Sequence, residues 1–207
     1  MSSDPRTVSA YHRRLPYGER VGVQSLHDDE LWPFEGDYAM QSLDDPVVPE
    51  PPRAGEPSGR PCLACADRER DVIWRDADWH VRAGGAERNP GLPIVAVLMP
   101  LAHYDAEDLP PALSTSFGPV MQRLMRAIGR IDGIGRVHMA RWGDGGSHFH
   151  VWFLARPLGM MQMRGAMLAV WDDLLPPIPD ELLATNLRTV ASAMATEGGE
   201  AVGAGLP

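Results

Sequence analysis

Residues 147–157, with the sequence SHFHVWFLARP, decide the fold. The stretch alternates polar and apolar residues and then becomes almost wholly apolar, with aromatic and β-branched side chains, which is typical of a β-strand. Because side chains alternate along a strand, His148 and His150 are expected on one face, and Phe149 and Val151 on the other. We therefore expect a strand that presents two imidazoles to a site, in preference to a pair of buried core histidines.

A glycine-rich turn, residues 143–146 (GDGG), comes directly before this strand. Glycines let backbone N–H groups approach an anion closely, although the same residues also suit an ordinary hairpin turn. Further upstream, short β-branched and aromatic runs predict four more strands. These are residues 72–75, 79–82, 93–100 and 136–142. Apolar side chains at helical spacing predict one main helix, residues 119–128.

The chain has two cysteines, Cys62 and Cys65, in a C-x-x-C arrangement. This spacing indicates either a metal site or a thiol redox motif. A redox motif is expected after a strand, at the start of a helix in a thioredoxin-like unit, and here a proline-rich segment precedes it. The arrangement therefore favours zinc, and the redox interpretation stays open.

Together these features resemble the histidine-triad family. The family motif is H-x-H-x-H, and residues 148–152 read HFHVW, so two of its three histidines are present and the third position is Trp152. In the galactose-1-phosphate uridylyltransferase branch this third position is glutamine. The run from Pro100 to His103 reproduces the Pro-x-x-His spacing that ends a family strand. The resemblance covers about residues 61–157 and implies an α+β, histidine-triad-like fold: an antiparallel sheet of about five strands with one main helix.

The resemblance also implies a structural zinc site. In the uridylyltransferase branch the ligands are both cysteines, the histidine of Pro-x-x-His and the first motif histidine. The matching residues here are Cys62, Cys65, His103 and His148. A Cys₂His₂ set is a closed tetrahedral site, which leaves no position for a reactive water.

His150 is then implied to be the catalytic residue. In the family the middle histidine attacks the α-phosphorus of a nucleotide and forms a nucleotidyl-histidine intermediate. The N–H groups of Gly145 and Gly146 and the hydroxyl of Ser147 are candidates to bind phosphate oxygens. The implied activity is that of a nucleotidyltransferase or nucleotide-phosphate hydrolase, and the implied partner is a nucleotide or nucleotide-sugar-type small molecule.

Trp152, counted among the substrate-binding residues, changes this expectation. Its indole offers a single N–H and no exchangeable acid near neutral pH, so a poor leaving group could not be protonated from this position. Transfer with a good leaving group is therefore favoured over hydrolysis. The alternative is a zinc-stabilised nucleotide-binding protein of the same fold that is weakly active or inactive.

The remaining sequence divides into extensions. We expect a proline-rich N-terminal arm (1–60) that packs on the domain or on a partner subunit, the histidine-triad-like domain (61–157), a helical extension (158–196) and a disordered tail (197–207). The C-terminal helices are expected to cover the sheet, and their methionines and tryptophan could also line a base pocket.

The composition of the chain limits which kinds of binding partner are expected. The 207 residues carry a formal net charge of −9, which argues against binding a nucleic-acid backbone. The sequence has neither a long apolar run nor an apolar segment of signal-peptide type at its start, so no membrane association and a cytoplasmic location are expected. Family members commonly pair through the main helix and a sheet edge. A homodimer is therefore expected, unless the arm covers that surface.

Overall fold

The computed structural model describes residues 16–19, 32–34, 41–84 and 89–203. The chain divides into two compact units, Met1–Pro51 and Pro52–Pro207. In the first unit an isolated parallel bridge joins Tyr17 and Leu43, and the rings of Trp32 and Phe34 meet edge to face. Most of the expected N-terminal arm lies outside the described residues.

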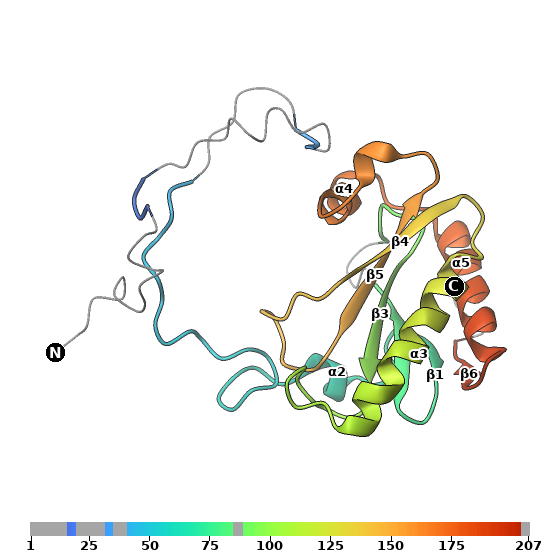
Figure 1. Cartoon of the computed structure of the whole chain (residues 1–207), viewed down its shortest axis with the longest axis horizontal. Coiled ribbons are helices and arrows are strands. Elements are labelled where there is room, and N and C mark those ends of the chain that lie inside the picture. Colours follow the sequence, from blue (N-terminus) through green and yellow to red (C-terminus); the bar gives the residue numbers. More distant parts are fainter. Residues whose placement is uncertain (1–15, 20–31, 35–40, 85–88, 204–207) are drawn as a thin grey trace. The chain divides into compact units, whose positions relative to one another are not determined.

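The second unit is built on a six-stranded sheet of antiparallel pairs, in the order β4-β5-β3-β2-β1-β6 (Figure 1). The strands are β1 (Val72–Arg75), β2 (Trp79–Ala83), β3 (Val95–Pro100), β4 (Ile134–Ala140), β5 (Val151–Pro157) and β6 (Glu200–Ala201). The helices are α2 (Leu63–Ala66), α3 (Pro111–Ile128), α4 (Met167–Leu174) and α5 (Asp180–Ala195), with a 3₁₀ turn at Met161–Met163. The predicted α+β fold with an antiparallel sheet is confirmed.

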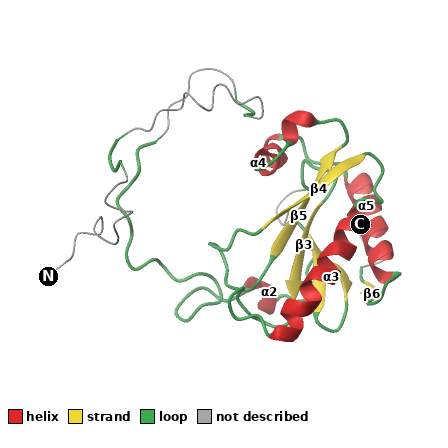
Figure 2. Cartoon of the chain, in the orientation of Figure 1, coloured by secondary structure: helices red, strands yellow, loops and turns green. Residues whose placement is uncertain are grey.

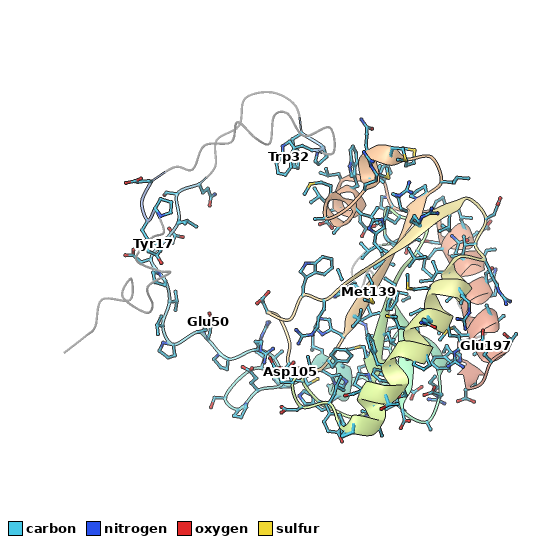
Figure 3. The ribbon with its side chains drawn as sticks, in the orientation of Figure 1. Tyr17, Trp32, Glu50, Asp105, Met139 and Glu197 are labelled. Carbon is cyan, nitrogen blue, oxygen red and sulfur yellow. The ribbon has the colours of Figure 1, made fainter. Side chains whose placement is uncertain are left out.

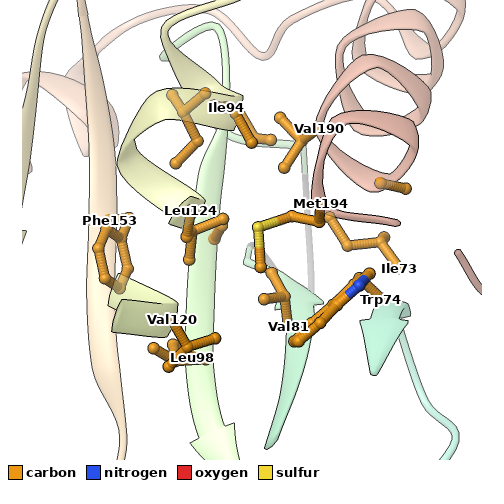
Figure 4. Close-up of a cluster of buried hydrophobic side chains, with 14 of the residues drawn as sticks. Ile73, Trp74, Val81, Ile94, Leu98, Val120, Leu124, Phe153, Val190 and Met194 are labelled. Carbon is orange, nitrogen blue, oxygen red and sulfur yellow. The ribbon is translucent and has the colours of Figure 1, made fainter. Parts of the chain in front are cut away.

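One face of the sheet is covered by α3 and α5, which lie side by side (Figure 2). The main apolar core lies between them and the strands, as Figure 4 shows for Leu124, Val190 and Met194 against Ile73 and Phe153. β5 sends Val151 and Phe153 into this core, together with Phe149 just before the strand. The predicted alternation is therefore observed, and it leaves His148, His150 and Trp152 for the other face.

A smaller apolar cluster lies apart from the main core, around β3, β5 and α4. Its buried members are Leu92, Val95, Leu154, Met163 and Leu168. Trp152 and Trp171 pack against it, half-buried. This cluster fixes the middle of β5 on the face that also carries the two motif histidines.

Two segments differ from the sequence-based expectation. The strand begins at Val151, because residues 147–149 bond outside the ladder: Ser147 N donates to Ala54 O, and Phe149 N donates to Tyr104 O. The tail is expected to be disordered from Glu197, but Glu200–Ala201 form β6 against β1. A salt bridge from Arg75 to Glu200 and the bond from Trp74 Nε1 to Gly198 O hold this end of the chain. None of the described helices combines the length and apolar character needed to cross a bilayer.

Candidate metal centre and adjoining histidine

Four side chains from three separate segments meet at one end of the sheet. Cys62 and Cys65 lie at the start and within the single turn of α2, His103 follows β3, and His148 precedes β5. Their ligand atoms all lie within 4.8 Å of one another. The sequence-predicted metal ligands are therefore brought together.

The spacing of these atoms fits a tetrahedral metal ion. Cys62 Sγ and Cys65 Sγ each lie 3.5 Å from His148 Nδ1, and Cys65 Sγ lies 3.4 Å from His103 Nδ1. Typical Zn–S and Zn–N bonds at tetrahedral angles place sulfur and nitrogen about 3.5 Å apart. The donor set and these three separations therefore suit zinc.

The far nitrogens of both histidines are held by oxygen atoms. His148 Nε2 lies 2.9 Å from the carbonyl of Pro100, to which it donates, so Nδ1 is left free of hydrogen. Burial lowers the pKa of His148, which favours the neutral imidazole that a metal requires. His103 Nε2 lies 3.2 Å from Ser147 Oγ, whose hydroxyl in turn donates to Ala54 O. Such second contacts fix ring orientation around a metal.

The cysteines do not have the character of a redox pair. Burial raises the pKa of the Cys65 thiol, and the contact with Cys62 raises it further. Reactive cysteines instead have a lowered pKa, commonly at the start of a helix that follows a strand. Here α2 is a single turn that follows an irregular segment. The geometry therefore favours metal binding over thiol exchange.

A loop within the expected N-terminal arm packs directly on this cluster. We call Arg53–Arg60 the strap. Ala54 forms a parallel bridge with Gly146, and a Cβ on Gly55 would lie 2.6 Å from His103 Cε1. Gly55 has a φ of +93°, a conformation that residues with side chains rarely adopt. A proline-rich segment without periodicity gave no signal for this contact.

Arg82 fastens α2 to the sheet. Its guanidinium donates to the carbonyls of Ala64, Asp67 and Arg68, which follow or lie within the cysteine turn. Its Nε donates to Nε2 of the buried His80. Burial and the charge of Arg82 lower the pKa of His80 to about 3, so this imidazole is neutral. The pair joins the cysteine turn to β2.

His150 lies beside the cluster with both ring nitrogens next to carbonyl oxygens. Nδ1 is 2.7 Å from His148 O, and Nε2 is 2.8 Å from Trp142 O. A carbonyl only accepts, so both contacts are hydrogen bonds only when both nitrogens carry hydrogen. An imidazole with a free lone pair on Nε2 would meet the Trp142 oxygen unfavourably. The indole of Trp152 meets this ring edge to face, and the indole of Trp142 forms a tilted pair with Trp152.

An ion-pair network holds the segment that carries Trp142. Asp105, labelled in Figure 3 between β3 and α3, is 9% exposed and binds Arg141 at 2.8 Å and Arg53 at 2.5 Å. Burial opposes ionisation of Asp105, but the Ala106 N–H and Arg53 outweigh it and lower the pKa of this carboxyl. Arg53 also donates to Gly143 O at 3.1 Å. No pattern in the sequence indicates that these residues pair.

The predicted phosphate-binding residues lie in the same loop. Gly145 O accepts from Ala54 N, while Gly146 bridges Ala54. Ser147 is buried, and its hydroxyl already bonds His103 and Ala54. Its position is thus that of a group orienting a cluster histidine. Trp152 is held by the smaller apolar cluster.

Comparison with family models and with curated proteins gives no match. Among solved structures the chain is similar to a zinc-bound histidine triad family protein from Mycobacterium smegmatis, with 19% identity and a TM-score of 0.47 over 65% of this chain and 91% of that one. A Hit-like protein involved in cell-cycle regulation from Bartonella henselae has 17% identity and a TM-score of 0.42, over 63% and 92%. A hypothetical histidine triad nucleotide-binding protein from Sulfolobus tokodaii has 11% identity and a TM-score of 0.44, over 64% and 90%. None of these descriptions names the uridylyltransferase branch. All three TM-scores lie below 0.5, at identities of 19%, 17% and 11%, so the histidine-triad family stays a prediction for this chain.

Proposed function

We propose that the domain binds one structural zinc ion through Cys62, Cys65, His103 and His148, and transfers a nucleotidyl group by way of His150. The observation that carries the proposal is the bond between His150 Nδ1 and the carbonyl of His148. It ties the orientation of the candidate nucleophile to a residue of the metal cluster, and it leaves Nε2 as the nitrogen for chemistry. Bound zinc would join three chain segments and take no part in the reaction.

In the proposed reaction the Nε2 lone pair attacks the α-phosphorus of a nucleotide. The bond from phosphorus to the leaving oxygen breaks, and that oxygen departs with the electron pair. The His148 carbonyl, which accepts from Nδ1–H, supports the positive charge that develops on the ring. An acceptor oxygen then attacks the same phosphorus, releases the nucleotidyl group and restores the imidazole.

Trp152 makes transfer the better proposal than hydrolysis. Its indole supplies no acid, so the leaving group must be stable as an anion, as pyrophosphate or a sugar phosphate is. A nucleotide or nucleotide-sugar substrate meets this requirement. Supporting phosphate contacts are proposed from the N–H groups of Gly145 and Gly146.

A second function is a nucleotide-binding protein without turnover. The observation that favours it is the 2.8 Å separation between His150 Nε2 and Trp142 O, since this carbonyl lies where phosphorus must approach. The two functions differ in whether a covalent adduct forms.

Incubation with α-³²P-labelled nucleoside triphosphates and nucleotide sugars tests the proposal. We expect an acid-labile labelled adduct on the wild type, absent from His150→Ala and retained by the control His138→Ala. His138 lies in β4 outside the cluster. Nucleotide binding without a labelled adduct would reject the transferase proposal in favour of a nucleotide-binding protein without turnover.

A further inference from the structure

The peptide group between Trp142 and Gly143 faces the nucleophilic nitrogen of the proposed transferase. We propose that this peptide rotates when a phosphate binds, so that Gly143 N–H replaces Trp142 C=O beside His150 and donates to a phosphate oxygen. The inference rests on the proposed function, and it adds a substrate-binding residue that the motif did not indicate.

The Trp142 carbonyl and a bound phosphate would place two acceptors at the same position beside His150. Trp142 O lies 2.8 Å from His150 Nε2. An attacking nitrogen must have phosphorus about 3–3.5 Å away and in line with its lone pair, so the carbonyl oxygen occupies the space of the substrate. A phosphate oxygen and a carbonyl oxygen cannot bond each other, because neither carries hydrogen. The carbonyl must therefore leave before nucleotide can bind.

Rotation of the Trp142–Gly143 peptide is the movement that would remove the carbonyl from this position. In a trans peptide the N–H points away from the C=O, so rotating the group turns an acceptor into a donor. Gly143 N–H would then point toward the ring, where a phosphate oxygen needs a donor. One rotation removes the conflict and supplies the missing contact.

Both flanks of the Trp142–Gly143 peptide are anchored. On one side Arg141 binds the buried Asp105 at 2.8 Å. On the other side Gly143 O accepts from Arg53 at 3.1 Å. Gly143 O belongs to the following peptide, so rotation of the Trp142–Gly143 peptide leaves this bond in place. The movement is thus confined to one peptide plane, and the loop does not need to open.

Residue 143 is a glycine, which suits a rotation of this peptide. Rotation changes the φ of Gly143 by about half a turn, and its present φ lies outside the left-handed region. The rotated state needs positive φ, which glycine adopts readily and other L-residues adopt only at a penalty. Trp142 is 48% exposed, so its side chain leaves room for the adjoining backbone to move.

The test uses the full-length protein as purified, with inorganic phosphate and AMP as probes. We expect either probe to shift the ¹H–¹⁵N signal of Gly143 downfield. Gly143→Ala should weaken the binding of both by about 5- to 30-fold, because alanine resists positive φ. The matched control is Gly118→Ala in α3, where an added Cβ meets nothing within 4 Å. This control should bind like the wild type.

A second pair of variants removes a steric ambiguity. A Cβ at Gly143 would lie 2.8 Å from Arg141 Nη1, so the single variant also displaces that side chain. Adding Gly143→Ala to Arg141→Ala should still weaken binding relative to Arg141→Ala alone. Equal affinities within this pair, an unmoved Gly143 signal at saturation, or no binding by the wild type would overturn the rotation. A labelled His150 adduct with an unmoved Gly143 signal would keep the transferase and reject the rotation. A shifted Gly143 signal without any labelled adduct would keep the rotation and reject the transferase.

Discussion

Gly55 lies against His103 so closely that a Cβ on Gly55 would be 2.6 Å from His103 Cε1 and 2.8 Å from Ser147 Oγ. The backbone of the strap therefore forms one wall of the metal cluster. Glycine is required at this position for two reasons: its φ is +93°, and there is no room for a Cβ.

Gly55→Ala should lower both stability and zinc content. The matched control is Gly133→Ala, where φ is +74° but an added Cβ meets nothing within 4 Å. The control should lose about 1–2 kcal/mol from backbone strain alone. Gly55→Ala should lose more, with zinc per chain falling below that of the control. Urea unfolding and metal analysis check this, and equal losses in the two variants would refute the contact.

Removal of zinc should destabilise the domain strongly, because binding free energy at a structural site is folding free energy. We expect about one zinc per chain in protein purified without chelator. Cys65→Ser should lower Tm by on the order of 10 °C or more. His138→Gln is the control with an unligated histidine. A metal-free preparation that melts at the wild-type temperature would reject the zinc assignment.

Trp152→His should separate catalysis from packing. The indole packs against the smaller apolar cluster, so the variant should lose about 2 kcal/mol of stability. If His150 is the nucleophile, the new imidazole should raise hydrolysis of substrates with poor leaving groups by up to about 10²–10⁴-fold. Trp152→Gln is the control, since it loses the same packing and supplies no acid. Equal hydrolysis rates for the two variants would show that residue 152 does not donate a proton.

His80 should make the domain sensitive to mild acid. Its pKa is about 3 in the folded chain and about 6.5 when unfolded, so the unfolded state binds the extra proton between these values. The free energy of unfolding should therefore fall by about 1.4 kcal/mol for each pH unit below about 6 on account of this group. His80→Gln keeps an acceptor for Arg82 and cannot titrate. Urea unfolding at pH 7, 6 and 5 should show a shallower slope for this variant, and parallel slopes would contradict the prediction.

Five of the six strands could be predicted because they carry local signals, and the set of four cluster residues was implied by the resemblance to the histidine-triad family. β-branched alternation located β3 and β5, and the C-x-x-C and H-x-H patterns located Cys62, Cys65 and His148. His103 was implied by the resemblance, because Pro100 to His103 matches the Pro-x-x-His spacing of the family. Each of these signals lies within a few residues of the element it predicts.

The contacts that could not be predicted join segments with no periodic pattern. Arg53 reaches Gly143, ninety residues along the chain, and Asp105 lies between two arginines from different loops. Proline and glycine in the strap show no periodicity that predicts an element, yet Gly55 adopts a left-handed conformation against His103. The carbonyl over His150 was also missed, because backbone direction in a glycine-rich turn is not encoded by residue type.

The strap has a consequence for where an independently folding fragment can begin. A fragment starting at Pro61 would hold every strand, all four cluster residues and His150. It would lack the Ala54 carbonyl that accepts from Ser147 and the Arg53 guanidinium that fixes the 141–146 loop. The buried Ser147 hydroxyl would then lose its acceptor, and the buried Asp105 carboxylate would lose one of its two arginines. The smallest fragment that keeps the histidine face intact therefore starts no later than Arg53, nine residues before the first metal ligand, Cys62.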